Sequence, residues 1–342
     1  MTPLLREQTW LAGMPEYSLC FRERNVPSVL FGCRRHAREI FETCTDEAEL
    51  RDRLDREYLA MLEALLDAGM PFRILNLDGA ESPLADALRD EGYPEFHIDA
   101  RGQGSTYAYP RDLMVYLADL GIALVSEGWL RPGAGDRDGV ECWTTRWSEG
   151  GRVLMSGGTL AVFHHPAKPG APEQATLEAL RERGLSIIEI PAGVFCTLDR
   201  DGDVLGLFYD HHIDRAAGLL RGLDGALHLL LGPGYQTGPL NAPLDSQASC
   251  DRVRRACDPA GVTVHVLPES CPPYAASLVQ SADGVVVTGS DHEAVLAVLA
   301  DIVGAENVVP TATPLTHFPV FASAGLHCLV TESPDFLLAP KR

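Results

Sequence analysis

The segment GVVVTGSDHEAVLAVLADIVGAENVVPT, residues 284–311, decides the fold class of this chain. A β-branched run at 284–289 precedes apolar residues at helical spacing over 292–303, and a second β-branched run follows at 307–311. β-Branched runs are typical of strands, and a 3.6-residue apolar period is typical of a helix. The segment therefore predicts one strand–helix–strand unit.

The same pattern recurs on the N-terminal side of this segment. It predicts helices at 46–68, 83–91, 172–183 and 246–257, and strands at 27–32, 71–77, 113–117, 122–127, 186–190, 204–209, 226–231 and 262–267. Residues 149–154 and 159–163 are predicted to form a hairpin, and 226–231 is predicted to pair with 204–209. The pattern repeats every ~60 residues, which indicates an α/β fold of repeated units. Units closed into a ring would meet around one central cleft, and we expect one domain, residues 1–342.

Composition excludes several classes of protein. The 342 residues are 46% apolar and 22% charged, and 48 acidic against 28 basic residues leave a net charge of −20. This charge opposes binding to nucleic acids and to anionic membranes, and it favours small cationic ligands. No segment approaches the ~18 apolar residues of a membrane span.

The N-terminus and the cysteines indicate the compartment. Arg6, Glu7 and Glu16 interrupt the apolar core that a signal peptide would need, so we expect a cytoplasmic protein. The nine cysteines include no CxxC pair, which indicates buried thiols rather than a disulfide framework. Because His164-His165 lacks partners at metal spacing, we expect no metal. The glycine pairs near 102–104 and at 157–158 lack the context of a nucleotide-binding loop.

Candidate functional residues lie at the edges of predicted strands. Asp112 precedes the strand 113–117, and Glu149 precedes two glycines. His212 and Asp214 follow the strand 204–209 and, two positions apart, point to one side of an extended chain. Cys328 begins the apolar run of the segment FASAGLHCLVTE, residues 321–332. Taken singly, each is equally compatible with a structural role.

Together, a thiol, an imidazole and three carboxylates suit one kind of chemistry. Carboxylates match the planar fork of a guanidinium ion. A thiolate can attack the central carbon of that ion while histidine transfers protons. These residues therefore predict a site for a guanidino compound.

The sequence resembles the guanidino-group-modifying enzymes of the pentein fold, which include arginine deiminases, agmatine deiminases, dimethylargininases and amidinotransferases. The resemblance lies in four ordered motifs: Arg111-Asp112, Glu149-Gly150-Gly151, His212-Ile213-Asp214 and the terminal segment Gly325-Leu326-His327-Cys328-Leu329-Val330-Thr331. It implies a five-bladed α/β propeller of ββαβ units around a central site.

The resemblance also implies a role for each residue. Cys328 would be the nucleophile that forms a thiouronium intermediate, and His212 the general acid and base. Asp112 and Asp214 would bind the guanidinium nitrogens, while Glu149 would add a carboxylate contact or orient His212. No metal or organic cofactor is implied.

Some assignments stay open. His211 is an alternative base, although the spacing to Asp214 favours His212, and His327 is expected to pack or to form hydrogen bonds. Arg111 is expected either to pair within the chain or to meet a substrate carboxylate. Arg152 replaces the Asp or Asn that commonly follows the two glycines in the family. Loops at 100–109, 127–147 and 232–245 are expected to contact the rest of the substrate. Trp129, Trp143 and Trp147 in the second loop either wall the cleft or, as is more common for loop tryptophans, pack within the protein.

The predicted function is a cysteine-dependent hydrolase that cleaves a C–N bond of a guanidino or amidino compound. The alternative is an amidinotransferase that passes the amidino group to an amine. A non-catalytic binding protein of the same fold is the hypothesis from another class. We expect a small cationic substrate and no nucleic-acid or membrane partner, and a homodimer is a compatible assembly.

Overall fold

The computed structural model describes the chain in segments, most completely between residues 114 and 311. The described residues are 11–13, 60, 63–65, 67–68, 73–77, 95–98, 114–126, 141–145, 152–164, 174–191, 194–198, 204–209, 216–233, 235, 246–271, 275–281, 283–311, 326 and 330–331. The predicted strand at 27–32 and the predicted helix at 83–91 lie outside them.

One unit shows how the local sequence builds the repeat. Strands β7 (Val153–Ser156) and β8 (Thr159–His164) pair antiparallel, helix α7 (Gln174–Glu182) follows, and β9 (Ser186–Pro191) pairs parallel with β8. Gly157 and Gly158 form the β7–β8 turn with φ of 46° and 73°. Positive φ at both central positions suits a tight hairpin and favours glycine. The glycine pair is therefore a turn, and the predicted hairpin is confirmed.

Two further units repeat this order of strands and helix. The first comprises β12 (Ala217–Arg221), β13 (Leu227–Leu231), α8 (Ser246–Cys257) and β14 (Thr263–Val266). The second comprises β15 (Leu278–Gln280), β16 (Val286–Thr288), α9 (Glu293–Val303) and β17 (Val308–Pro310). In both, the first two strands pair antiparallel and the second and third pair parallel. The segment 284–311 thus forms β16, α9 and β17, as predicted.

Seven further strands form two more sheets. β4 (Met114–Leu117), β5 (Ile122–Ser126) and β6 (Glu141–Thr145) have the same pairing pattern. The other sheet has the order β18-β1-β2-β3, from β18 (Val330–Thr331), β1 (Leu11–Gly13), β2 (Arg73–Leu77) and β3 (Glu95–Ile98). Since β18 and β1 come from opposite ends of the chain, this sheet closes the molecule on itself. Short 3-10 helices lie at Ala118–Leu120, Asp258–Ala260 and Ala305–Asn307.

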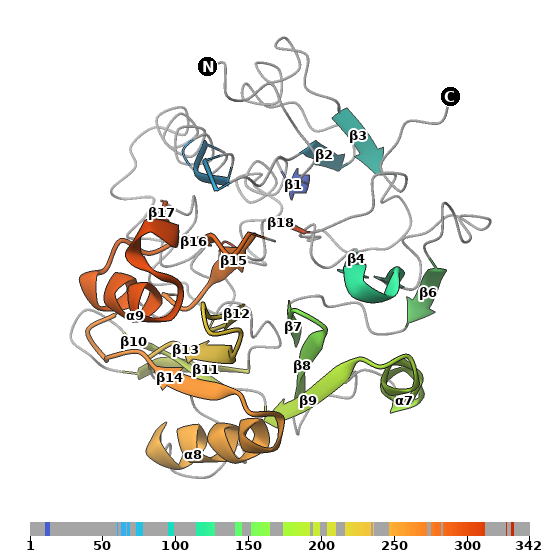
Figure 1. Ribbon diagram of the computed structural model, residues 1–342. Helices are drawn as coiled ribbons and strands as arrows, with labels where there is room; N and C mark the ends of the chain where they lie inside the picture. The colour runs from blue at the N-terminus through green and yellow to red at the C-terminus, as the bar shows by residue number, and fades with distance from the viewer. Residues whose placement is uncertain are drawn as a thin grey trace.

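The five sheets surround a common centre. We call the strand that begins the order of its sheet the first strand of its unit: β4, β7, β12, β15 or β18. In Figure 1 each of these strands lies nearest the centre. Strand β12 contacts β7 and β15, and β18 contacts β4. The predicted α/β ring of repeated ββαβ units is therefore confirmed among the described residues.

Apolar packing between neighbouring units supports this arrangement. One core cluster joins the sheets of β4 and β7 through Val115, Leu117, Val153 and Val162. Another joins β12–β14 to β15–β17 and α9, and includes Leu220, Leu230 and Leu299. Because side chains of adjacent sheets share one core, each unit stabilises the next.

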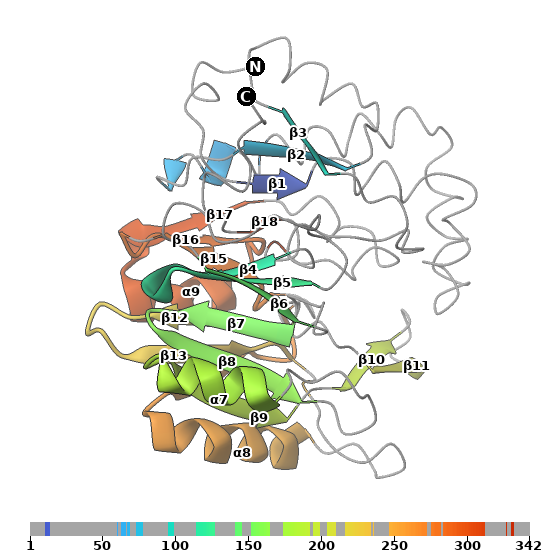
Figure 2. The same ribbon diagram turned by 90° about the vertical axis from the view of Figure 1, so that its right-hand side faces the viewer.

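A sixth, two-stranded sheet differs from the prediction. β10 (Val194–Leu198) pairs antiparallel with β11 (Val204–Tyr209), and Figure 2 shows this hairpin to one side of the units. The predicted pairing of 204–209 with 226–231 is therefore wrong, because β13 pairs with β12 and β14 instead. In each of the observed antiparallel pairs, β10–β11 and β12–β13, the two strands are neighbours in sequence. Short connections favour such pairing.

Other predictions agree within a few residues. The described residues near the end of the predicted helix 46–68 are helical, and Leu65 is fully buried. Strands β1, β3, β6, β10, β12 and β15 were not predicted. Among the described residues, no helix combines the length and the apolar character that crossing a membrane requires.

Candidate functional site

The six predicted site residues lie outside the described residues. They are Arg111, Asp112, Glu149, His212, Asp214 and Cys328. The structure therefore does not bring these side chains together or separate them; the same holds for the alternative base His211 and for His327. What it does describe is the strands that adjoin them in sequence.

These adjoining strands occupy equivalent places in four different units. β4 begins two residues after Asp112, and β7 begins four residues after Glu149. β12 begins three residues after Asp214, and β18 begins two residues after Cys328. Each of these strands is the first of its unit and lies nearest the centre in Figure 1. The sequence motifs thus precede the strands that line the middle of the ring.

The segment around Cys328 is described on both sides of the cysteine. Leu326, two residues before the cysteine, is helical and fully buried. Val330 and Thr331, just after it, form β18 and pair with Ala12 and Leu11. The prediction that an apolar strand follows the cysteine is confirmed, although that strand is only two residues long.

Arg152 is the residue of this region whose burial the sequence did not reveal. It precedes β7 directly and is 4% exposed. A buried guanidinium is costly unless acceptors surround it. Arg152 therefore brings a positive charge into the interior only three residues from Glu149.

A second thiol and imidazole do meet in the structure, at the start of α9. The Cys271 Sγ atom lies 3.5 Å from Nδ1 of His292. That nitrogen accepts a hydrogen bond from the Ala294 N–H at 3.3 Å and so caps the helix. Burial raises the pKa of the Cys271 thiol, which disfavours the thiolate that nucleophilic attack requires. This pair is structural.

Two further thiols, Cys250 and Cys257, are buried as well. Cys250 and Cys257 are buried in the cluster that α8 forms against its sheet. Burial raises the pKa of the Cys250 thiol, and it raises the pKa of Cys257 to about 12. Cys250, Cys257 and Cys271, three of the nine cysteines, are therefore buried thiols, as the sequence predicted.

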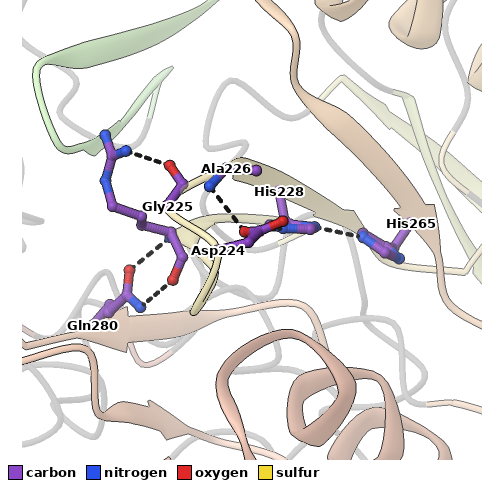
Figure 3. A network of polar contacts seen from close by, with 7 residues as sticks. Asp224, Gly225, Ala226, His228, His265 and Gln280 are labelled. Atoms are coloured by element: carbon purple, nitrogen blue, oxygen red, sulfur yellow. Dashed lines mark hydrogen bonds and ion pairs between the residues drawn. The ribbon is translucent and has the colours of Figure 1, made fainter.

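A histidine pair was missed by the sequence analysis. His228 Nδ1 lies 2.9 Å from Nε2 of His265, and the two rings stack at 5.2 Å between centroids. His228 Nε2 is 3.8 Å from the Asp224 carboxylate (Figure 3). Burial, and then the charge of His228, lower the pKa of His265. The parallel pairing of β13 with β14 brings these histidines together, and no local sequence pattern signals it.

Hydrogen bonds around Arg221 complete this network. Its guanidinium donates to the carbonyls of Gly225 at 2.5 Å and Gly157 at 2.8 Å, and its backbone N–H donates to Gln280 at 2.8 Å. These contacts join the turns of two units to β15. Figure 3 shows the part of the network around Gly225 and Gln280. The β12–β13 turn follows the C-terminal end of β12, whereas Asp214 precedes its N-terminal end in sequence. The network therefore stabilises the ring at the C-terminal end of β12.

Trp143 is part of a strand rather than of a substrate loop. It lies in β6, within the predicted loop 127–147, and packs against the core cluster of β4 and β7. Its indole N–H donates to Glu141 at 3.1 Å, and Arg183 lies over its ring at 5.8 Å. Arg183 also forms a bidentate pair with Glu141 at 2.9 Å. This part of the loop prediction is wrong, while Trp129 and Trp147 lie outside the described residues.

His164 has a partner that the sequence did not suggest. Its Nε2 atom lies 3.0 Å from the Glu189 carboxylate on the neighbouring strand, and Arg181 pairs with the same carboxylate. Among the described residues, no group of three or more His, Cys, Asp or Glu side chains is arranged to hold a metal ion.

Comparison with known proteins gives structural likenesses. No protein-family model matches the chain, and no curated protein matches it in sequence. The chain is similar in structure to a mutant of DDAH from Pseudomonas aeruginosa in complex with citrulline. The identity is 13%, the match covers 95% of this chain and 98% of that chain, and the TM-score is 0.47.

Two further likenesses are of lower coverage. One is to ArgZ, an arginine dihydrolase from the ornithine-ammonia cycle in cyanobacteria, at 14% identity over 72% of this chain and 35% of that chain, with a TM-score of 0.41. The other is to the inosamine-phosphate amidinotransferase StrB1 from Streptomyces griseus, at 14% identity over 72% of this chain and 77% of that chain, with a TM-score of 0.38.

Proposed function

We propose that this chain is a guanidino-group-modifying enzyme: a cysteine-dependent hydrolase that cleaves a C–N bond of a guanidino or amidino compound. One observation carries the proposal. In each of the four motifs the proposed site residues come a few positions before the first strand of a different unit, and these strands lie nearest the centre of the ring. Units related by rotation about one axis place equivalent strand ends at the same end of that axis. The motif residues would then converge on one site.

Charge supports a cationic substrate for this site. The chain has a net charge of −20, and three of the proposed site residues are carboxylates. Asp112 and Asp214 would each accept hydrogen bonds from guanidinium N–H groups, because a carboxylate matches that planar fork. Glu149 would add a third carboxylate contact or orient His212.

The proposed reaction proceeds in two halves. The Cys328 thiolate adds to the central carbon of the guanidinium; the C–N bond then breaks, and the leaving amine takes a proton from His212. This leaves a covalent thiouronium on Cys328. His212 next removes a proton from water, the hydroxyl adds to the same carbon, and the C–S bond breaks to release a ureido product and the thiolate.

The bound cation would help to form the nucleophile. A positive charge a few ångströms from the sulfur favours the thiolate over the thiol. The free cysteine therefore need not be strongly acidic, and no metal or organic cofactor enters the scheme.

Turnover assays with arginine, agmatine and methylated arginines test the proposal. We expect Cys328→Ala to abolish release of ammonia or amine, a loss of at least about 10³-fold, because the covalent step disappears. His212→Ala should abolish turnover as well. Cys271→Ala is the matched control: it removes a buried thiol beside an imidazole and should retain near wild-type activity. Near wild-type activity in Cys328→Ala would show that the assigned site is wrong.

Acceptor amines separate the two reaction classes. With water alone, a hydrolase forms a ureido product, whereas an amidinotransferase accumulates the thiouronium until an amine is added. Binding of a guanidino compound without turnover, unchanged in Cys328→Ala, would instead indicate a binding protein.

A further inference from the structure

The strand that follows Cys328 is held by the opposite end of the chain. β18 contains only Val330 and Thr331, and both pair antiparallel with β1, in the registers Ala12–Val330 and Leu11–Thr331. β1 in turn pairs parallel with β2, with Ala12 opposite Ile74. β1 therefore lies between β18 and the rest of its sheet.

β18 also has a neighbour among the strands nearest the centre. It contacts β4, which begins two residues after Asp112. Figure 1 shows β18 between the β1–β2 pair and β4. The strand after the proposed nucleophile thus touches the strand after a proposed substrate carboxylate, while its backbone is anchored on β1.

A two-residue strand cannot fix its own position. It has few backbone hydrogen bonds, and strands of this length owe their geometry to a paired neighbour. Its in-sheet partner here is β1, so displacement of β1 would release the backbone two residues beyond Cys328.

We propose that β1, through the backbone of Leu11 and Ala12, is the positioning element for the nucleophile. This inference rests on the proposed function. A misplacement of about 1 Å in a reacting group can cost ~10²-fold in rate. Because the carboxylates that would bind the substrate precede β4 and β12 rather than β18, loss of the β1–β18 pairing acts on kcat and leaves KM nearly unchanged.

Proline substitution in the full-length protein tests this role. Proline removes a backbone N–H, and consecutive strand residues donate to opposite sides. Of Leu11→Pro and Ala12→Pro, one therefore removes a donor towards β18 and the other a donor towards β2. We expect kcat to fall by about 10²-fold in at least one variant with KM within about threefold of wild type. Ala12→Val keeps the N–H and should retain wild-type kcat.

Hydrogen exchange distinguishes loss of positioning from loss of folding. Peptides from β12–β14 and β15–β17 should keep wild-type protection in the proline variants, whereas the peptide containing residues 330–331 should lose it. If 330–331 loses protection and kcat stays at the wild-type value in both variants, β1 has no positioning role.

A cross-link provides a second test in case the proline variants do not fold. In Ala12→Cys/Val330→Cys, the two residues are directly opposite, at a separation that a disulfide can span. We expect peptide mass spectrometry to find the 12–330 disulfide after mild oxidation, with kcat within about threefold of wild type. Failure to form this disulfide, or its formation with loss of kcat, overturns the inference.

The outcome also separates this inference from the proposed function. If Cys328→Ala abolishes turnover while both proline variants keep wild-type kcat, the positioning role fails and the function stands. If Cys328→Ala retains turnover, the proposed function itself fails.

Discussion

Gly218 is a residue that packing between units requires to be glycine. It lies in β12, and a Cβ atom built on it would meet the Ala276 carbonyl oxygen and lie 2.7 Å from Cγ of Leu278. Backbone atoms of a paired core cannot move aside as a side-chain tip can. The absence of a side chain therefore sets how closely β12 approaches the β15 unit.

We expect Gly218→Ala to lower the free energy of unfolding by about 3 kcal/mol, because the added methyl overpacks a rigid contact. Gly222→Ala is the matched control, since the atoms nearest to its Cβ would be side-chain atoms of His228 and Asp224 rather than backbone atoms. Its cost should stay below about 1 kcal/mol. Urea unfolding of both variants provides the measurement, and equal losses would contradict this explanation.

The His228–His265 pair should make stability depend on pH. The pKa of His265 is lowered in the folded protein, by burial first and by His228 second. The unfolded chain therefore binds a proton at His265 at a higher pH than the folded chain does. Stability is fully present above the ordinary histidine pKa of ~6.5 and is lost as pH falls through it towards the folded value.

Thermal unfolding between pH 8 and pH 5 measures this effect. We expect Tm to decline below about pH 6.5 in the wild type, and to decline less in His265→Gln. His164→Gln, which places glutamine in another strand, is the control and should leave the His265 contribution in place. A decline of the same size in His265→Gln would show that another group is responsible.

At the scale of elements, α9 shows how one helix face anchors a unit. Val295, Leu299, Ile302 and Val303 are buried, and Leu299 is completely buried against the sheets of β12 and β15. His292 caps the N-terminus, and the Asn307 side chain donates to the Val303 carbonyl at 2.7 Å. The helix is thus held by its apolar face and at both ends.

We expect Leu299→Ala to lower the free energy of unfolding by about 2–5 kcal/mol, because it leaves a cavity between two units. Asp301→Ala changes an exposed residue of the same helix and should cost less than about 0.5 kcal/mol. Chemical denaturation compares the two. A loss below about 1 kcal/mol for Leu299→Ala would mean that α9 does not carry the packing between these units.

At the scale of the whole molecule, the net charge of −20 bears on substrate capture. A negative protein attracts cations at long range, and salt screens this attraction over a Debye length of ~10 Å at 0.1 M. The proposed substrates carry a guanidinium, so their encounter with the protein should depend on ionic strength.

We expect kcat/KM to fall several-fold between low salt and 0.5 M salt, and more steeply for agmatine, a dication, than for arginine, because screening scales with charge. The value of kcat should change little. Steady-state kinetics at matched pH provides the measurement. Salt-independent kcat/KM for agmatine would exclude electrostatic capture.

The ring also bears on how the chain is organised. Shared cores join neighbouring units, and the β1–β18 pair joins the two ends of the chain. We therefore propose that residues 1–342 form one domain.

The sequence alone determined the elements whose periodicity is long enough to read. The helices at 174–182, 246–257 and 293–303 and the strands β9, β11, β13, β14 and β16 follow from apolar spacing, which reflects local backbone geometry. The sequence also predicts that one thiol, one imidazole and three carboxylates form a site for a guanidino compound. That prediction comes from the chemistry of these groups and does not depend on knowing the fold.

Only the tertiary structure decided which strands are neighbours. Strands β1, β12 and β15 contain three to five residues each, too few to show a period. The parallel pairing of β13 with β14, the contact of His228 with His265, and the closure of Leu11–Gly13 on Val330–Thr331 join residues by backbone hydrogen bonds and packing across the fold. Such contacts depend on where the whole chain places each strand, so no local pattern encodes them.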